Sequence, residues 1–251
     1  MQQAILLDDI MHPMMENYTL LKKYLLHKKY KTLKFHIKSR ILTPGNDPTG
    51  LVYLGKNLLL HSDASTGKLY KINVKSKKIV ETKKLPIDHP WGMCIDKATL
   101  WITDDIKRVI LNINIEDLTI NKIFDYSKKD VPQLKFKPDL HGIIIIGDKL
   151  FVNDWSNNCI LQIDKENGKI LKGIDIKIPD LSGLLYFNDS IWVASSMVSY
   201  LFRINKKGQI TGYLKLMKGN YNHIHALTTL KNKEIGFTSK NKNLIIIGEI
   251  I

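Results

Sequence analysis

Short apolar runs alternate with polar turns most clearly between Asp139 and Ile174. Two of the turns contain glycine, at Gly147-Asp148 and at Asn167-Gly168. Strand-sized runs joined by Gly-containing turns predict β-hairpins, and Asn-Gly is typical of a type I′ turn. The segment therefore predicts a four-stranded antiparallel sheet. Its strands are expected at Gly142–Ile146, Lys149–Asn153, Cys159–Asp164 and from Lys169 onward.

The same unit occurs five times between Asp47 and Ile251. A strand-rich repeat of roughly 40 residues is typical of β-propellers. The interval between the second and third units is the longest, because Ser127–Pro138 is inserted there. The sequence thus predicts an all-β fold, a five-bladed propeller with four-stranded antiparallel blades. The small residues that align the first strands of the five units are Gly50, Gly92, Gly142, Gly183 and Ala226.

The two ends of the repeat region complement one another. The last repeat has three strand patterns before Ile251, and Lys34–Ile41 is a strand pattern with no partner before it. Pairing them completes the final blade and removes the exposed edges that an open array would leave. We therefore expect residues 32–251 to form one closed propeller. A six-bladed ring is the alternative, and it would need residues 1–31 to form a degenerate blade.

Residues 1–31 do not match the repeat and are expected to be an N-terminal extension. Within them, Asn17–Lys29 places Tyr18, Leu21 and Leu25 on one face of a helix, with lysines mostly on the other side. This pattern predicts a short amphipathic helix. A basic amphipathic helix either packs on its own domain or lies on a membrane surface, and we favour packing.

Charge and composition narrow the classes of function. The formal net charge of +14 suggests an anionic partner, but the lysines are spread along the chain and arginine is rare. Arginine makes the bidentate contacts to phosphate and guanine, so this composition disfavours nucleic acid. No apolar run approaches the roughly 20 residues of a transmembrane helix. Asp8 and Asp9 lie where a signal peptide would be apolar, so we expect a cytoplasmic protein.

The sequence lacks the motifs that are typical of several common enzyme and metal-binding classes. Cys94 and Cys159 fall in predicted strands of different repeats without metal-ligand spacing, which predicts buried free thiols. The sequence contains no P-loop, GxGxxG, GxSxG or HExxH motif. Nucleotide-phosphate binding and the common hydrolase mechanisms therefore have no support.

Histidines and acidic residues recur where the predicted first and second strands meet the mouth of the central channel. His141 and His225 come just before a first strand, and we predict that they are catalytic. Imidazoles and carboxylates that converge on a channel can bind a divalent metal or act as acid and base. A divalent metal is therefore the candidate cofactor, with its identity left open. The predicted ligand-binding residues are Trp91, Trp155, His89, Asp104, Asp154 and Ser182.

Each of these residues also has a structural alternative. His141 and His225 would then bond to neighbouring loops and rigidify the ring. Asp104 and Asp154 would cap the turns that follow them, as Asp commonly does at such positions. Trp91 and Trp155 fit packing and ligand contact equally well.

The repeat motif resembles the blades of the NHL-repeat, glutamine-cyclotransferase-like and virginiamycin B lyase-like groups. The resemblance covers Asp47–Ile251. In virginiamycin B lyase-like propellers, histidines and an acidic residue serve a metal-assisted elimination, and His141-Gly142-Ile143 resembles their blade motif. The resemblance thus implies a metal-dependent lyase or hydrolase. The best-matching segments are Gly67–Val80, Leu100–Asp105 and His141–Ile170.

Two classes of function remain. The first is a propeller that binds a small molecule or metal at the channel mouth, as an enzyme of this kind would. The second is a non-enzymatic scaffold that contacts a protein partner, with Ser127–Pro138 as the expected contact. The oligomeric state is left open.

Overall fold

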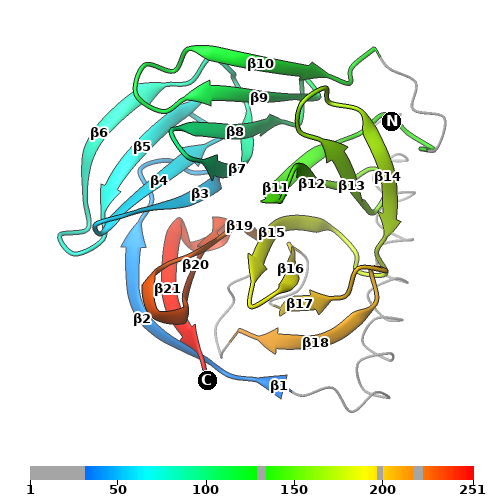
Figure 1. The fold of residues 1–251 in the computed structure, drawn as a ribbon. Helices are drawn as coiled ribbons and strands as arrows, with labels where there is room; N and C mark the ends of the chain where they lie inside the picture. The colour runs from blue at the N-terminus through cyan, green and yellow to red at the C-terminus, as the bar shows by residue number, and fades with distance from the viewer. Residues whose placement is uncertain (1–31, 129–133, 197–199, 217–222) are drawn as a thin grey trace, which may run out of the picture.

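The computed structural model describes residues 32–128, 134–196, 200–216 and 223–251. These residues form five sheets arranged as blades around a central channel (Figure 1). The innermost strands are β3, β7, β11, β15 and β19, one from each blade, and each contacts the innermost strands of its neighbours. The ring closes on five blades without residues 1–31, which confirms the predicted five-bladed propeller over the six-bladed alternative.

Blades 1 to 4 each follow one repeat, with consecutive strands paired from the axis outward. Blade 1 consists of β3 (Pro48–Gly55), β4 (Leu58–Asp63), β5 (Lys68–Asn73) and β6 (Lys78–Lys84). Blade 2 consists of β7 (Pro90–Asp96), β8 (Thr99–Asp104), β9 (Val109–Asn114) and β10 (Ile120–Asp125). Blade 3 consists of β11 (Leu140–Ile146), β12 (Lys149–Asp154), β13 (Cys159–Asp164) and β14 (Ile170–Asp175). Blade 4 consists of β15 (Leu181–Phe187), β16 (Ser190–Ser195), β17 (Tyr200–Ile204) and β18 (Ile210–Lys215).

Blade 5 combines the two ends of the propeller. Its strands are β19 (Ile224–Thr229), β20 (Glu234–Ser239), β21 (Leu244–Ile250) and β2 (Phe35–Leu42). β2 pairs antiparallel with β21, with Phe35 opposite Ile250. The predicted closing strand is thus confirmed. A further strand, β1 (Thr32–Leu33), pairs parallel with β18 of blade 4, so the chain before β2 also joins blades 4 and 5. The sequence did not predict this second pairing.

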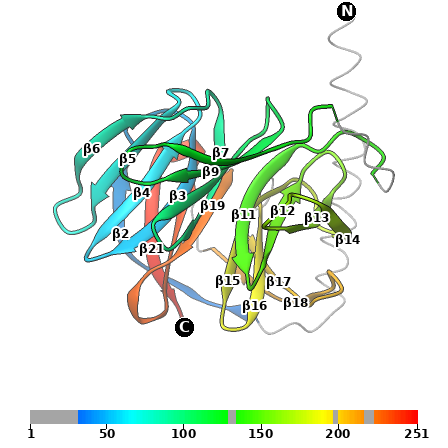
Figure 2. The ribbon, with the colours of Figure 1, turned by 45° about the horizontal axis from the view of Figure 1, so that its top comes forward.

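The blades pack face to face through apolar side chains. Alternate residues of each strand point toward opposite neighbours, so an inner strand is buried on both faces. Between blades 1 and 2, Val52 and Leu60 pack with Ile102 and Leu111. Burying one such side chain contributes about 1.5 to 3 kcal/mol. In Figure 2 the blades stand side by side around the axis.

The outer turn of blade 3 differs from the predicted type I′ turn. Gly168 has a positive φ of 72°, but Asn167 does not adopt the left-handed conformation. Instead, the Asp164 carboxylate accepts the backbone N–H groups of Glu166 (2.9 Å) and Asn167 (3.1 Å), and Gly168 N donates to the Asp164 carbonyl (2.9 Å). The Asp164 side chain therefore shapes a longer loop. The two-residue type I′ assignment was wrong, although Gly168 is still required.

Three other predictions concern the N-terminal helix, the insertion Ser127–Pro138 and the two cysteine thiols. The predicted helix Asn17–Lys29 and residues 129–133 of the insertion lie outside the described residues. The described part has two 3-10 turns, η1 (Lys231–Lys233) and η2 (Lys240–Lys242), and none of its helices has the length and apolar character to cross a membrane. Both cysteines are free thiols, and burial raises the pKa of Cys94 and raises that of Cys159 to about 12.

Candidate functional site

Each blade presents three equivalent positions to one mouth of the channel. The start of each first strand pairs with the end of the second, as Leu140 does with Asp154 in blade 3. In each blade, one residue directly precedes the first strand, and the five such residues form an outer ring: Asp47, His89, Asp139, Asp180 and His223. The second residue of each first strand forms an inner ring of Thr49, Trp91, His141, Ser182 and His225. The residue after the second strand gives a third set of Ala64, Asp105, Trp155, Ser196 and Lys240.

Two inner-ring hydroxyls tie blades together. Thr49 Oγ1 donates to the Pro90 carbonyl of blade 2 at 2.6 Å. Ser182 Oγ bonds to the Ile224 carbonyl of blade 5. Both side chains are almost fully buried. The contacts of Ser182 are those of a bridge between blades, and its predicted part in ligand binding stays a prediction.

The other three inner-ring residues form an aromatic stack. The Trp91 indole stacks on the His141 imidazole with ring centroids 4.2 Å apart, and on the His225 imidazole at 4.8 Å. His89 approaches the same indole at 5.9 Å. The fold therefore brings together four residues that the sequence predicted for the site. Trp91 Nε1 is buried and has no hydrogen-bond partner among the described residues.

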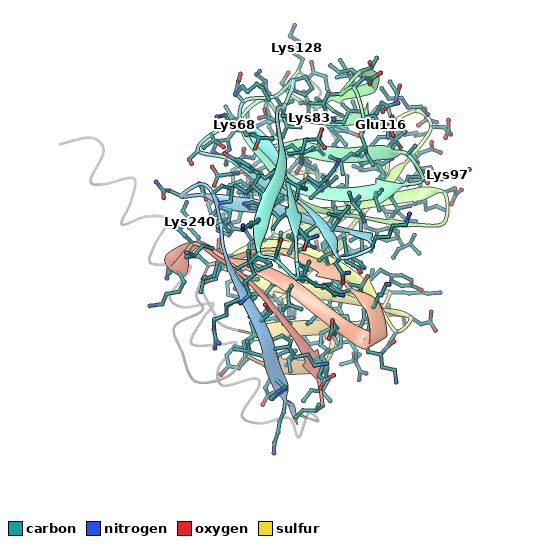
Figure 3. The ribbon with its side chains drawn as sticks, turned by 90° about the vertical axis from the view of Figure 1, so that its left-hand side faces the viewer. Lys68, Lys83, Lys97, Glu116, Lys128 and Lys240 are labelled. Atoms are coloured by element: carbon teal, nitrogen blue, oxygen red, sulfur yellow. The ribbon has the colours of Figure 1, made fainter. Side chains whose placement is uncertain are left out.

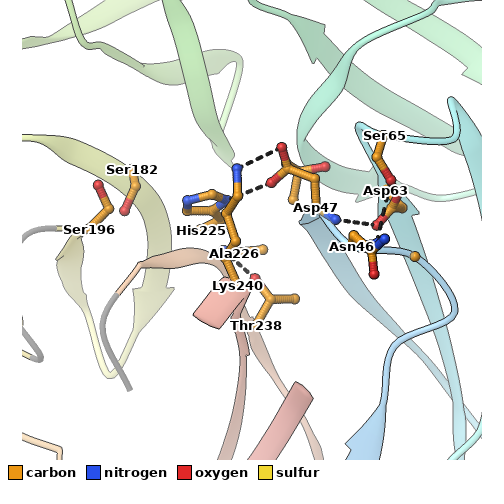
Figure 4. Close-up of polar contacts among 12 residues, drawn as sticks. Asn46, Asp47, Asp63, Ser65, Ser182, Ser196, His225, Ala226, Thr238 and Lys240 are labelled. Carbon is orange, nitrogen blue, oxygen red and sulfur yellow. Dashed lines mark hydrogen bonds and ion pairs between the residues drawn. The ribbon is translucent and has the colours of Figure 1, made fainter. Parts of the chain in front are cut away.

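His225 is held as a neutral imidazole. Burial lowers its pKa to about 3, and the positive charge of Lys240 contributes to the shift. Its Nδ1 lies 3.7 Å from Asp47 Oδ1, too far for a hydrogen bond. Asp47 pairs instead with Lys240, Nζ to Oδ2 at 2.8 Å, and its backbone N–H donates to Asp63 at 2.9 Å (Figure 4). Near neutral pH, His225 therefore offers a ring nitrogen whose lone pair can accept a hydrogen bond.

Asp105, Asp139 and His141 form a group that can hold a metal ion. Each offers one ligand atom, and these atoms lie within 4.8 Å of one another. His141 Nδ1 lies 3.3 Å from the Leu181 carbonyl oxygen, which can only accept, so Nδ1 carries the proton. In the neutral imidazole the lone pair is then on Nε2, which lies 3.3 Å from Asp139 Oδ1. A carbonyl that fixes the tautomer in this way is typical of metal-binding histidines.

The electrostatics of this group also favour a cation. Burial raises the pKa of Asp105, and the nearby Asp139 carboxylate raises it further, while His89 Nδ1 at 2.5 Å opposes the shift. Asp139 Oδ1 is buried and lacks a hydrogen-bond partner in the described part of the chain. An unpaired buried carboxylate oxygen is costly unless a cation or donor meets it. The residues therefore fit a divalent cation.

Asp104 and Asp154 hold the loops of the mouth. Asp104 Oδ1 accepts the Lys107 N–H at 2.8 Å, and Asp154 Oδ1 accepts those of Asn157 at 3.2 Å and Asp139 at 3.1 Å. These contacts are the ones expected if Asp104 and Asp154 cap the turns that follow them. A direct role of Asp104 and Asp154 in ligand binding stays a prediction.

Trp155 lies beside the stack, and its role in ligand contact is likewise still a prediction. Its ring centroid is 6.3 Å from that of His141. Its Nε1 donates to Asp180 Oδ1 at 2.5 Å, across the boundary between blades 3 and 4. Ser196 Oγ bonds to the other oxygen of the same carboxylate.

From the outer ring the sequence predicted only His89 for the site, and from the third set only Trp155. Asp139 stands two residues before His141, and Asp105 directly follows Asp104. A signal was present, because the residue two positions before the inner-ring residue is Asp or His in all five repeats. The prediction rested on the inner-ring position and on the ends of the second strands, so it did not recognise the outer ring as a repeated set.

No protein-family model and no curated protein matches the sequence. The fold is similar to that of a glutaminyl cyclase from Myxococcus xanthus, with a TM-score of 0.70 and 14% sequence identity over 88% of this chain and 98% of that chain. It is also similar to virginiamycin B lyase from Staphylococcus aureus, with 18% identity over 86% of this chain and 73% of that chain. The TM-score is 0.49 for the selenomethionine-substituted lyase and 0.50 for a catalytically inactive variant with quinupristin. These similarities confirm the expected resemblance at the level of the fold.

Proposed function

We propose that the protein binds a small molecule at the mouth of its central channel and acts on it as a metal-dependent lyase or hydrolase. The group Asp105, Asp139 and His141 is the observation that carries this proposal. Enzymes occur among the similar propellers, but a fold alone does not select a reaction. The argument therefore depends on the chemistry of the mouth.

The donor set suits a catalytic rather than a structural cation. Two carboxylate oxygens and one imidazole nitrogen match the preferences of Zn²⁺ and Mn²⁺. Three protein ligands leave coordination positions for water or substrate, as in catalytic metal sites. His89 supports the set, because its Nδ1 bonds to Asp105 Oδ1. A cation held here would polarise a substrate oxygen or lower the pKa of a water molecule.

Three further residues suit the handling of a substrate. His225 is neutral near pH 7, so one of its ring nitrogens can accept a hydrogen bond from a substrate. Trp91, stacked on both histidines, suits the flat or apolar part of a substrate. Lys240 places a positive charge at the same mouth, where it can attract an anionic group. These roles extend the predicted catalytic pair His141 and His225, with His141 as a metal ligand and His225 as a hydrogen-bond acceptor that orients the substrate.

Metal content tests the proposal. Protein purified without chelator is expected to contain about one divalent ion per chain by elemental analysis, and metal-free protein is expected to show a higher melting temperature with Mn²⁺ or Zn²⁺. Asp139→Asn and His141→Ala should lose both effects. The matched control is Asp180→Asn, which alters the same ring position in blade 4, outside the group. His225→Ala should retain the metal because His225 does not belong to the group.

Wild-type protein that carries no metal, and whose melting temperature does not respond to Mg²⁺, Ca²⁺, Mn²⁺ or Zn²⁺, would contradict the metal-dependent function. The non-enzymatic scaffold would then be the better explanation of the mouth. Asp180→Asn that loses metal as fully as Asp139→Asn would also count against the assigned ligands.

A further inference from the structure

The gap between blades 1 and 2 is closed by a charge network. Lys71 and Lys83 both pair with Glu81, Lys83 at 2.9 Å. The Lys83 ammonium group also reaches the backbone carbonyl of Glu116 in blade 2, and Figure 3 shows these two residues next to each other. The volume left in this gap is about 10 Å³.

The gap between blades 2 and 3 is closed by a different pair of contacts. Lys122 of β10 pairs with Glu166 in the outer turn of blade 3, Nζ to Oε2 at 2.7 Å. The Phe124 ring packs so closely on Gly168 that an added Cβ would lie 2.5 Å from it. An ion pair and an aromatic ring thus seal this boundary.

The corresponding positions between blades 3 and 4 form neither the charge network of the first boundary nor the ion pair and aromatic packing of the second. In blade 3, Gln162 of β13 lies opposite Lys172 of β14. The equivalent pair in blade 1 is Lys71 opposite Glu81, so Lys172 occupies the position of an acidic residue. The outer turn of blade 4 carries Lys206-Lys207 in place of the turn that contains Glu166. Lys172 and Lys206 have no ion-pair partner among the described residues.

The apolar side chain that packs against the outer turn is also smaller at this boundary. Ile174 lies 3.0 Å from the Cβ position of Gly208, where the preceding boundary has Phe124 against Gly168. An isoleucine fills less volume than a phenylalanine. The boundary therefore holds a pocket of about 560 Å³, within the range of small-molecule sites.

This pocket has an apolar floor and a cationic rim. Its floor includes Phe151, Ile174 and Ile204, and its rim includes Lys172, Arg203 and Lys206. Arg203 is held in place by Thr211, which accepts from Nε at 3.1 Å and from Nη2 at 3.3 Å. The acidic residue in the lining is Asp189, which accepts a hydrogen bond from Tyr186 at 3.2 Å. The lining thus carries four cationic side chains, those of Lys149, Lys172, Arg203 and Lys206, against the single carboxylate of Asp189. An excess of positive charge around an apolar cavity matches an anion with an apolar body.

We propose that the pocket between blades 3 and 4 binds a small amphiphilic anion, an apolar or aromatic body with one carboxylate, sulfonate or phosphate group. The apolar body lies against Phe151 and Ile174, and the anionic group meets Lys172, Arg203 and Lys206. The pocket includes Ile146 and Lys149, which lie at the ends of β11 and β12 farthest from the channel mouth. It is therefore a second site, independent of the metal-binding group.

Fluorescence titration with 8-anilino-1-naphthalenesulfonate tests this site in the full chain. We expect saturable binding of one probe per chain, displaced by octanoate but not by octylamine. Lys172→Glu should weaken binding at least tenfold, because it restores the acid found in blade 1. Ile174→Phe should weaken it to the same degree by filling the cavity as Phe124 does, without a change of charge. Lys68→Glu on blade 1 makes the same charge change and should leave the affinity within twofold.

Three results would overturn the proposal: no saturable binding of the probe, displacement by octylamine as readily as by octanoate, or equal affinity of wild type and Lys172→Glu. Circular dichroism checks that the variants fold. If Ile174→Phe does not fold, Lys172→Glu and its control Lys68→Glu decide the question, because Lys172 has no ion pair that its replacement would break.

Discussion

Lys240 of the last blade pairs with Asp47 of the first blade, with Nζ 2.8 Å from Oδ2, directly beside His225. The pair crosses the boundary between blades 5 and 1, next to the connection from β2 to β3. It also places one positive and one negative charge next to a buried neutral imidazole. The Lys240–Asp47 ion pair therefore belongs both to the contact between the last and first blades and to the candidate site.

We expect this pair to contribute modestly to stability. A double-mutant cycle with Asp47→Asn and Lys240→Met should give a coupling free energy of roughly 0.5 to 1 kcal/mol, because Lys240 is 41% exposed and water screens the interaction. Urea unfolding of the four proteins measures it. Lys242→Met, in the same exposed turn, should show no coupling to Asp47→Asn. A coupling near zero for both lysines would mean that the pair does not stabilise this boundary.

Removal of β2 should open the ring. Deleting residues 1–42 leaves the edge of β21 unpaired, so the shortened protein should aggregate. Deleting residues 1–31 is the matched control and should remain monodisperse, because it keeps both β1 and β2. Size-exclusion chromatography and thermal unfolding compare the two. A soluble 43–251 fragment with one sharp unfolding transition would show that closure is not needed.

Gly168 should tolerate substitution less well than Gly147. Both have positive φ, 72° and 63°, so alanine is strained at either position. A Cβ at Gly168 would also meet the Phe124 ring, whereas a Cβ at Gly147 meets nothing within 4 Å. We expect Gly147→Ala to cost about 1 kcal/mol and Gly168→Ala about 2 kcal/mol or more in the free energy of unfolding. Equal urea midpoints for the two variants would contradict the packing of Phe124 on this turn.

The stability of the protein should fall in acid partly through His225. Its pKa is about 3 in the folded protein and near 6.5 in the unfolded chain, so the unfolded chain binds the proton first as the pH falls. Stability is then lost between about pH 6.5 and pH 3, by roughly 2 to 3 kcal/mol at pH 4.5. His225→Gln should lose less stability than wild type between pH 7 and pH 4.5. Denaturant unfolding at both pH values measures the difference, and identical losses would refute the buried neutral state.

The sequence alone determined the blades, because their signals are local. Strand alternation, glycine at turns and the repeat anchored at Gly50 and Gly142 depend on neighbouring residues, and they were sufficient to predict five blades and the closing strand. They also identified the inner ring, since His141 and His225 occupy the same position of their repeats. The predicted turn at Asn167-Gly168 failed in its type because a side chain, Asp164, competes for the backbone N–H groups.

The tertiary structure decided what lies between the blades. Asp105 belongs to blade 2 and Asp139 to blade 3, and only the ring geometry places their carboxylates together with His141. The pairing of β1 with β18 and the open boundary between blades 3 and 4 depend in the same way on how whole sheets pack. Such distances depend on the tilt and spacing of the blades around the axis. The repeat pattern carries no information about these quantities, because it specifies the strands and turns within a blade and not the packing of one blade on the next.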